Sequence, residues 1–485
     1  MNTGSAGKAG SAPIKRIAII GDGLEAWLAV NYLLAALGGK RIEMVVCGVP
    51  GSARLDGLNA VIPARANLSA IGLSDKVLAR TCGASFSLGT QFAGQLKPYG
   101  SFGLDYLGLP FHHHWLRTNP QDSSDYFNWS PAMLAMQRGL FAPPVKRNEI
   151  GTLRHGMAYH VDIGKFTRLL RERATRHGVK VTAGSLASVD RESGSDRIVS
   201  LTSSRAETIT TDLYVDCSGA QRALINGAAS KRWIPAPQMP GFYIAAGQRQ
   251  SSGAPAPYHR LSFDPHGWTL EVPTPDQVYT VNMSTTQPTE DSMEFLPGHF
   301  EKPWIENCVA LGSAAATFLP VEPMHTQYLL SSLNWVVDLL PGRDCAAKET
   351  EEYNQLVTAD LGEIYDLAAL YELGRVKGSL QSLDPVEGGI HDSLRSRFKL
   401  FRRRGWIAPV DSDFLTPADW ISAFILLGAV PARYDPLAER LSLDALQSGL
   451  QKLKLQIEKT ATEFPLHRDY LRAIKSTPAV APGGK

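Results

Sequence analysis

The glycine-rich turn GDGLEA at residues 21–26 is the first segment whose residue types and spacing could do chemistry. It follows the apolar run 17–20 and leads into a helical pattern. In such a turn Gly21 permits the tight bend, Gly23 lets the backbone approach a pyrophosphate, and Ala26 allows close packing of strand and helix. Free N–H groups at the start of the helix then bind phosphate. The pattern predicts a dinucleotide-binding site, and the alternative is a turn with no chemical role.

The residue that usually binds the ribose in such a site is an acid at the end of the second strand. Cys47 follows the strand-like run 42–46 and holds that position. Because a thiol is a poor ribose acceptor, either a neighbouring backbone group takes this role or the affinity for a dinucleotide is reduced.

Two clusters of titratable side chains also invite chemical interpretations, the histidine run 112–114 and the arginine run 402–404. Three consecutive side chains point in different directions and cannot close one coordination shell, so we expect no metal at the histidines. One of them is expected in a core hydrogen bond. The arginines lie beside Phe401 and Trp406 and could bind phosphate, but the near-neutral overall charge favours an exposed loop.

The composition is that of a globular protein and argues against two classes of partner. With 49 basic against 47 acidic residues the formal charge is +2, so we expect neither nucleic acid nor a membrane surface as partner. Five scattered cysteines, an odd number without a CxxC pair, indicate reduced thiols in the cytoplasm and no zinc site. Residues 1–13 lack the apolar stretch of a signal peptide, and no run is long enough to span a membrane.

Strand-like and helix-like segments alternate up to about residue 230, which predicts an α/β fold. Four strand-like runs follow in a pattern that predicts an antiparallel sheet for substrate, and after Gly312 the pattern becomes helical. Helices are expected at 165–177, 327–340, 348–373 and 443–462. The expected divisions are a flexible tail at 1–14, a cofactor-binding domain at 15–345 with the inserted sheet at about 241–283, a helical cap at 346–475 broken by a linker near 384–389, and a flexible tail at 476–485.

Several segments together resemble the flavin-dependent tryptophan halogenases, in the same order and spacing from about residue 15 to 472. They are GDGLEAW at 21–27, ASFSLG at 84–89, PFHHHWLR at 110–117, AYHVD at 158–162, DCSG at 216–219, GWTLEVP at 267–273, NCVALG at 307–312, FLPVE at 318–322, and the stretch around Trp420 and PARYDP at 431–436. The resemblance implies a Rossmann-like FAD-binding fold of the flavin monooxygenase type. It implies that FAD is bound by Gly21, Gly23, Ala26, Asp216, Gly219, Gly312 and Leu319.

The same resemblance implies a reaction. In that family a separate flavin reductase supplies reduced FAD, which reacts with oxygen to a C4a-hydroperoxide, and chloride attacks this species to give hypochlorous acid. The oxidant reaches a lysine, and a nearby acid assists substitution on an indole ring. So short-lived an oxidant must be held beside one ring carbon, since otherwise it reacts indiscriminately.

The residues that would do this chemistry depart from the family's pattern. Ser87 stands where the lysine should be, and a hydroxyl can neither form a chloramine nor carry a positive charge. The acid maps onto Glu322, but Pro323 follows it and has no N–H for a halide. The alternative role of Glu322 is to cap the helix expected near His325.

The substrate wall is altered as well. The family's WxWxIP signature keeps its first tryptophan, Trp268, and its Tyr-His-Pro-Phe-Gly motif becomes LKPYG at 96–100. Tyr99 keeps an aromatic ring there and would shape the pocket with Trp268. Lys97 adds an amine, which is either a relocated chloramine lysine or a solvated or anion-pairing side chain. The resemblance also allows His112 to line the substrate pocket.

These changes spare the segments that carry the fold and predict a halogenase-like fold that does not perform standard tryptophan chlorination. The first hypothesis is a two-component FAD-dependent oxygenase acting on an aromatic or indole-like small molecule, with Glu322 as acid or base and with Ser87 and Lys97 orienting the substrate. The second is a halogenase that uses an unusual residue. The third is a pseudoenzyme that binds FAD poorly or not at all and acts as a binding or regulatory partner. A homodimer stays open in each case.

Overall fold

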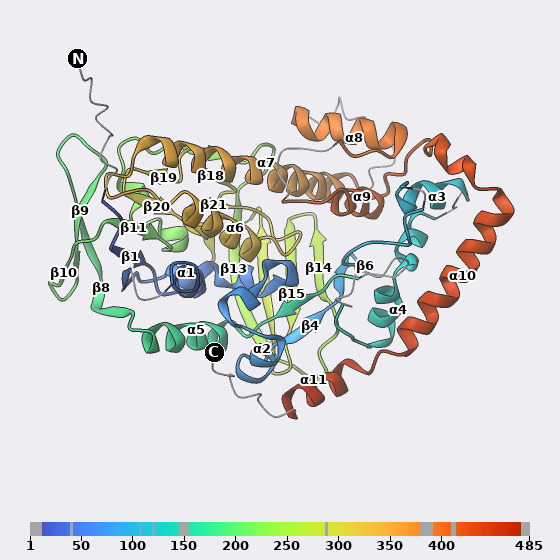
Figure 1. The fold of residues 1–485 in the computed structure, drawn as a ribbon, viewed down its shortest axis with the longest axis horizontal. Coiled ribbons are helices and arrows are strands. Elements are labelled where there is room, and N and C mark those ends of the chain that lie inside the picture. Colours follow the sequence, from blue (N-terminus) through green and yellow to red (C-terminus); the bar gives the residue numbers. More distant parts are fainter. Residues whose placement is uncertain are drawn as a thin grey trace, which may run out of the picture.

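The computed structural model describes residues 12–38, 42–106, 108–118, 120, 122–144, 155–286, 290–378, 391–408 and 414–476. A largely parallel sheet, an antiparallel platform and a helical C-terminal third follow one another along the long axis of the molecule (Figure 1). This arrangement confirms the mixed α/β fold expected from the sequence.

The parallel sheet has eight strands in the order β10-β9-β8-β2-β1-β11-β20-β19. They are β1 (Arg16–Ile20), β2 (Glu43–Gly48), β8 (Lys180–Arg191), β9 (Ile198–Ser203), β10 (Thr208–Ile209), β11 (Leu213–Asp216), β19 (Trp304–Ile305) and β20 (Cys308–Ala310). β1 pairs in parallel with β2 and β11, whereas β9, β10 and β19 pair antiparallel at the edges. The central strands are unbroken apolar runs because elements cover both faces of a parallel sheet.

The glycine turn follows β1 and opens α1 (Leu24–Ala36), as predicted. α1 packs against α5 (Ile163–Arg176) and α6 (His325–Asp338). Gly21 takes φ +130°, and a Cβ there would lie 2.3 Å from the carbonyl oxygen of Cys217. Gly21 is therefore needed for the close contact between the turn and the end of β11.

The predicted antiparallel platform is a seven-stranded sheet in the order β17-β13-β16-β15-β14-β5-β6. Its strands are β13 (Phe242–Gln250), β14 (His259–Asp264), β15 (Gly267–Pro273), β16 (Gln277–Ser284), β17 (Met293–Phe295), β5 (Gly89–Phe92) and β6 (Gln95–Pro98). The sheet is larger than the expected insertion, because β5 pairs in parallel with β14 and brings β6 with it. This pairing places Lys97 and Tyr99 at the edge of the platform.

Two three-stranded sheets and several short helices connect these layers. The sheets are β3 (Val61–Pro63) with β7 (Ala158–His160) and β4 (Ser85–Ser87), and β12 (Trp233–Pro235) with β18 (Gly298–Phe300) and β21 (Ala316–Thr317). The short helices are α2 (Asp75–Thr81), α3 (Phe111–Arg117) and α4 (Pro131–Arg138). Three connections made of 3-10 helix, at 52–59, 219–221 and 312–314, lie near the glycine turn and pack on one another.

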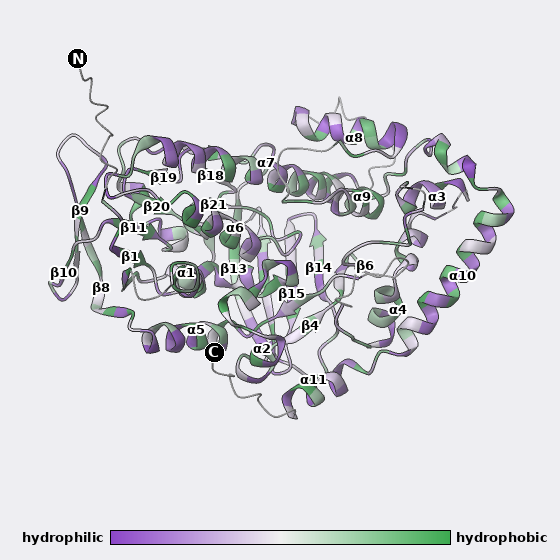
Figure 2. Cartoon of the chain, in the orientation of Figure 1, coloured by the Kyte–Doolittle hydropathy of each residue, from purple (hydrophilic) through white to green (hydrophobic). Residues whose placement is uncertain are grey.

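The helical third comprises α7 (Ala347–Lys377), α8 (Asp392–Arg404), α9 (Pro417–Leu426), α10 (Leu443–Thr462) and α11 (His467–Ser476). α7 contacts α6, α8 and α9 and so joins this third to the parallel sheet (Figure 1). α8 and α10 alternate hydrophilic and hydrophobic residues, as expected for helices that bury one side (Figure 2). The expected linker near 384–389 lies outside the described residues.

Two sequence-based expectations about the chain differ from the structure. The arginine run 402–404 was expected in an exposed loop, but it forms the last turn of α8. The expected N-terminal tail is shorter than residues 1–14, because Pro13 forms a bridge with Gly342 and Ile14 is buried. Residues 1–11 and 477–485 lie outside the described residues, and Ser476 ends α11.

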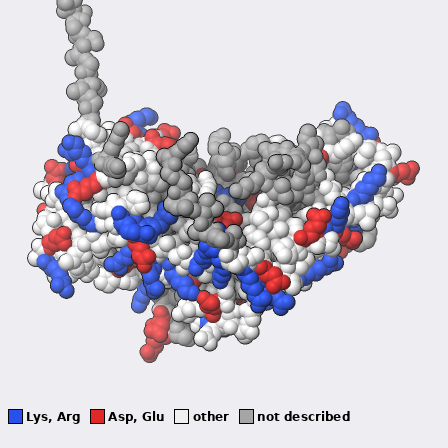
Figure 3. Space-filling model, turned by 60° about the horizontal axis from the view of Figure 1, so that its bottom comes forward, with Lys and Arg blue, Asp and Glu red and all other residues white. Residues whose placement is uncertain are grey.

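The surface and the helices fit the near-neutral composition. Basic and acidic side chains are interspersed over the face seen in Figure 3. No helix among the described residues is long and apolar enough to cross a membrane. All five cysteines are buried and free. Within the described ranges, no group of three or more histidine, cysteine or acidic residues is arranged to hold a metal ion.

Candidate functional site

A buried ion pair stands at the centre of the expected reaction site. Lys97 on β6 donates its Nζ to Oε1 of Glu322, and the two side chains are 6% and 10% exposed. Tyr371 on α7 donates its hydroxyl to the same oxygen at 2.5 Å. The platform, the segment before α6 and the long helix α7 therefore meet at one carboxylate.

This geometry excludes one of the two roles considered for Glu322. α6 begins at His325 with Met324 as its N-cap, and no side chain caps it. The capping alternative is therefore wrong, since the carboxylate contacts Lys97 and Tyr371. It also identifies Lys97 as an ion-paired side chain and not a solvated one. As a pair, Lys97 and Glu322 neutralise each other inside the protein.

Tyr99 lies beside this ion pair within a buried polar network. Its hydroxyl contacts Thr90 Oγ1 at 3.2 Å and His259 Nε2 at 3.3 Å. Burial first, and then the nearby charge of Glu322, raises the pKa of the Tyr99 phenol, so the phenol stays protonated. Ser87 on β4 is a hydrogen-bond neighbour of this phenol and donates to the carbonyl of Gly89 at 2.9 Å. The structure thus brings Ser87, Lys97, Tyr99 and Glu322 together, as expected, while their chemical roles stay predictions.

The histidines of this network are poor acids. His259 Nδ1 lies 3.4 Å from Nε2 of His160. Burial, assisted by the charge of Lys97, lowers the pKa of His259 to about 3, and burial lowers that of His160 as well. Both rings are therefore neutral near pH 7 and do not donate a proton to a bound molecule as imidazolium.

Trp268 on β15 lies in the core beside this site. Its Nε1 donates to Glu372 of α7 at 2.8 Å, and its ring packs on Phe92, 6.2 Å between centroids. Phe92 in turn packs edge-on against Tyr371 at 5.2 Å. Trp268 therefore fastens α7 to the platform, one ring away from the ion pair.

His112 was expected in the substrate pocket, but its contacts are with the helical third. Its Nε2 lies 2.6 Å from the carbonyl oxygen of Gly405, just after α8, and its ring lies 4.0 Å from that of His113. Burial lowers the pKa of His112 to about 3. The three consecutive histidines have three different partners, since His113 accepts from the backbone of Asp435 and His114 contacts the carbonyl of Tyr106.

The second part of the expected site is the crevice where FAD would bind, and here a carboxylate fills the space beside Gly312. Glu25, in the first turn of α1, accepts hydrogen bonds from Ser313 N at 2.9 Å and Ser313 Oγ at 2.8 Å. A Cβ on Gly312 would lie 2.6 Å from the carboxyl carbon of Glu25. Gly312 therefore makes room for a side chain of the chain itself.

A second carboxylate holds the start of α1. Asp56 accepts the N–H of Leu24 at 2.8 Å, and a Cβ on Gly23 would lie 2.9 Å from Asp56 Oδ1. This backbone N–H belongs to the helix end where a pyrophosphate is expected. Burial raises the pKa of Glu25 and Asp56, and the neighbouring acids Glu25 and Asp22 raise that of Asp56 further.

The remaining residues of the expected cofactor set are also engaged within the chain. Asp216 accepts from the backbone of Ser218, Leu224 and Ile225. A Cβ on Gly219 would lie 2.6 Å from the carbonyl oxygen of Ser52. Ala26 and Leu319 are completely buried, and Cys47 is buried at the ribose position. The connections that should line an open crevice pack against one another.

The residues present therefore do not fit FAD. A pyrophosphate needs free N–H donors and positive potential, whereas Leu24 and Ser313 already donate to carboxylates. Its negative charge would also face Asp22, Glu25 and Asp56. The sequence predicted the glycine turn correctly but did not show that acids of the chain occupy it.

Two residues of the reaction site could not be recognised from the sequence. Tyr371 and His259 contact Glu322 and Tyr99 from elements far away along the chain. Nothing local marks them, because a tyrosine in a helix and a histidine in a strand are ordinary core residues. Glu25 was the one available signal, since it is an acid within the turn expected to bind phosphate.

The overall architecture is that of the flavin-dependent oxidoreductases. It combines a sheet with a glycine turn after β1, an antiparallel platform and a covering helical third. The family model for tryptophan halogenase matches residues 16–442, so the chain belongs to the tryptophan halogenase family. Members of this family are flavoproteins that use FAD supplied in reduced form and act on aromatic substrates.

The relatives are distant in sequence and close in fold. The chain is 24% identical over 405 residues to tryptophan 7-halogenase RebH of Lentzea aerocolonigenes, covering 71% of this chain and 73% of RebH. It is 22% identical over 405 residues to tryptophan 6-halogenase ThaL of Streptomyces albogriseolus, covering 73% of this chain and 74% of ThaL. The structure of BrvH, a flavin-dependent halogenase from Brevundimonas sp. BAL3, matches with a TM-score of 0.84 at 21% identity, covering 95% of this chain and 99% of BrvH. At this identity the structural match shows the fold alone.

Proposed function

We propose that this chain is a noncatalytic member of the tryptophan halogenase family that does not bind FAD and acts as a binding or regulatory protein. The observation that carries the proposal is the pair of carboxylates, Glu25 and Asp56, on the N–H groups of Ser313 and Leu24. The oxygenase and halogenase hypotheses both need reduced FAD in this crevice, whereas the third hypothesis does not.

Electrostatics support the same conclusion. Two like unit charges 4 Å apart repel by about 4 kcal/mol at an effective dielectric constant of 20. A pyrophosphate would meet this repulsion from the two buried acids Glu25 and Asp56 when both are ionised. Protonation of the acids would relieve it, but the carboxyl groups would still occupy the N–H donors and the space beside Gly23 and Gly312.

The reaction site supports the proposal independently. Ser87 offers no amine, and Lys97, the amine nearby, is paired with Glu322. Glu322 also accepts from Tyr371, so the carboxylate that would assist substitution is held by two donors of the chain. Such a satisfied cluster rigidifies a structure, and its polar atoms already have partners within the chain.

An absorbance spectrum and an FAD titration test the proposal. We expect the purified protein to be colourless and calorimetry to detect no binding of FAD at the glycine turn. A purified protein with a flavin spectrum, or substrate-dependent oxygen consumption with reduced FAD, would support the oxygenase hypothesis instead. Chlorinated or brominated product in mass spectrometry would support the halogenase hypothesis.

A gain of binding sharpens this test. Glu25→Ala with Asp56→Ala removes both carboxylates from the crevice, so we expect FAD to bind at least tenfold more tightly than to the unaltered protein. The matched control, Glu301→Ala with Asp392→Ala, removes two exposed acids and should leave FAD affinity unchanged. Equal affinity in the crevice variant and the control would argue that the two acids do not block the site.

A further inference from the structure

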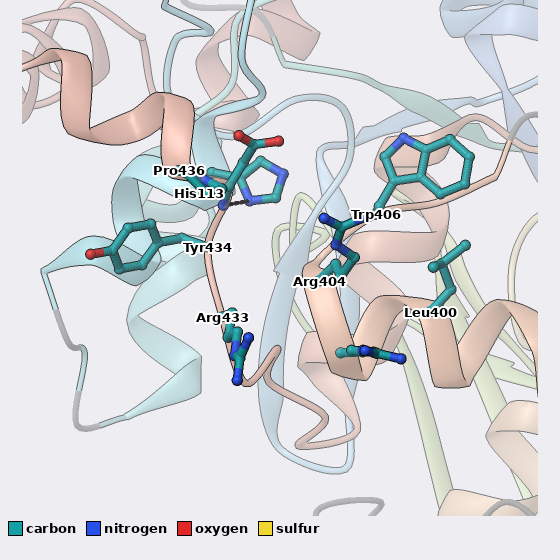
Figure 4. A pocket seen from close by; sticks show the side chains of 9 residues that line it. His113, Leu400, Arg404, Trp406, Arg433, Tyr434 and Pro436 are labelled. Atoms are coloured by element: carbon teal, nitrogen blue, oxygen red, sulfur yellow. Dashed lines mark hydrogen bonds between the residues drawn. The ribbon is translucent and has the colours of Figure 1, made fainter.

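Three segments that stood out in the sequence converge on one pocket away from both sites described above. The pocket encloses about 740 Å³ and is lined by the end of α8, the residues after it, the segment 433–436 and His113 of α3. Figure 4 shows His113, Tyr434 and Arg433 on one side of the view and Arg404 and Trp406 on the other. The histidine run, the arginine run and the PARYDP segment thus share one cavity.

The charge of this pocket is strongly positive for a nearly neutral protein. Arg403, Arg404 and Arg433 line it against a single carboxylate, Asp435. None of these three guanidinium groups forms a salt bridge with an acid of the described residues, and all three are exposed. Arg402, the first of the run, points elsewhere and lies 5.9 Å from the ring of Phe398. Three arginines against one carboxylate thus give this pocket a formal net charge of about two positive units.

The walls of the pocket are held in place by buried contacts. Gly405 ends α8 with φ +67°, and a Cβ there would lie 3.0 Å from Cε1 of His113. Its carbonyl contacts His112 at 2.6 Å, and the N–H of Asp435 donates to His113 at 3.2 Å. Ala432 donates its N–H to the carbonyl of Arg402 at 2.7 Å. These contacts fix the backbone that carries Arg404 and the backbone that carries Arg433.

An exposed aromatic ring completes the pocket. Trp406 is 50% exposed, whereas Trp268 beside the reaction site is buried. An indole beside guanidinium groups offers a flat apolar face on which the ring of a ligand can stack. The volume lies within the range of about 300–1,000 Å³ that small-molecule sites occupy.

We propose that this pocket binds a small molecule that joins a phosphate group to a flat ring, the chemistry of a nucleotide. Arginine forks match phosphate oxygens in pairs, and a phosphate monoester carries about −1.5 to −2 charges at neutral pH, which balances the pocket. A ligand with a single carboxylate in place of the phosphate would leave one positive charge of the pocket unpaired. The proposal is independent of whether the glycine turn binds FAD.

Isothermal titration with ADP, pyrophosphate and adenosine separates the two parts of the proposed ligand. We expect ADP to bind at least tenfold more tightly than pyrophosphate, and its advantage over adenosine to be larger still. The affinity for ADP should fall as the salt concentration is raised. Equal affinity of ADP and pyrophosphate would overturn the stacking role of Trp406. No saturable binding of ADP or pyrophosphate would overturn the proposal altogether.

Variants then locate the binding. Arg404→Gln with Arg433→Gln should weaken ADP binding at least tenfold, and Trp406→Ala should reduce ADP affinity to that of pyrophosphate. The matched control, Lys399→Gln with Lys459→Gln, removes two exposed positive charges outside the pocket and should change affinity less than twofold. The same loss in the arginine variant and the control would show nonspecific attraction and overturn the site.

The same variants keep this proposal distinct from the proposed function. FAD carries a pyrophosphate and two ring systems, so the pocket could bind FAD weakly without any flavin at the glycine turn. FAD binding that disappears with Arg404→Gln and Arg433→Gln therefore supports the pocket. FAD binding that persists in that variant and responds to Glu25→Ala belongs to the glycine turn.

Discussion

The serine at position 87, where the family's motif has a lysine, affects the roles that Lys97 and Glu322 can have. With Ser87 at the position of the amine, the nearby amine is that of Lys97, and it is held in an ion pair with Glu322. A buried ion pair adds little net stability, yet breaking it leaves an uncompensated charge. We infer that the cluster now serves the fold.

Lys97→Met should test this at once. We expect the free energy of unfolding to fall by about 3–5 kcal/mol, because Glu322 would remain buried without its cation. Denaturation in urea measures the change, and Lys97→Met with Glu322→Gln should recover most of it. Lys180→Met, which breaks an exposed pair with Glu43, should change stability by about 1 kcal/mol or less. A loss as small as this control in Lys97→Met would contradict a tightly held pair.

His259 predicts a pH dependence of stability. Its folded pKa of about 3 lies below the ordinary value of 6.5, so the folded state binds fewer protons than the unfolded state. The stability linked to His259 is therefore fully present above pH 6.5 and is lost as the pH falls toward 3, by about 2 kcal/mol between pH 7 and pH 5. Urea denaturation at both values should show a smaller difference for His259→Gln than for the exposed control His177→Gln. Identical pH slopes for the two variants would contradict the buried neutral ring.

At the scale of elements, the helix and the connections around the glycine turn bind carboxylates of the chain. The N-terminus of α1 and the connection at 312–314 have the backbone geometry for phosphate, but the side chains on them supply the anions instead. A carboxylate satisfies the same N–H groups as a phosphate oxygen does. Under the proposed function, these carboxylates let the fold persist without a bound cofactor.

Gly312→Ala tests whether Glu25 fills that space. The added Cβ would meet the Glu25 carboxyl group at 2.6 Å, and φ at this position is +56°. We expect a loss of stability of about 2–4 kcal/mol, of which about 1–2 kcal/mol is the left-handed backbone. Glu25→Ala should rescue the part due to the clash, which a double-mutant cycle of melting curves measures. Strictly additive effects of the two substitutions would contradict direct contact.

How well the sequence predicted an element depended on how local its signal was. The helix expected at 443–462 matches α10 because its apolar spacing lies within the segment. The pairing of β5 with β14 joins residues about 170 positions apart and leaves no local trace. The contact between Lys97 and Glu322 has the same character, so its residues could be named from the sequence but their pairing could not.

At the scale of the whole molecule, Glu25 and Asp56 occupy N–H donors of the expected cofactor site, whereas arginines line the pocket at the end of α8. Near-neutral composition concealed this separation, since three acids at or near the glycine turn and the three arginines that line the pocket cancel in a sum. Overall charge was therefore a poor guide to the arginine run 402–404. Position within the fold decides what a charged side chain can bind.

This separation predicts how ligands change the stability of the intact protein. A ligand at one hundred times its dissociation constant stabilises the folded state by about 2.7 kcal/mol, or about 3 °C in the melting temperature of a chain of this size. We expect ADP at saturation to give such a rise because it would tie α8 to the segment 433–436. Arg404→Gln with Arg433→Gln should abolish the rise, whereas Glu25→Ala with Asp56→Ala should preserve it. Differential scanning calorimetry measures all three, and a rise that instead depends on Glu25 and Asp56 would place the nucleotide at the glycine turn.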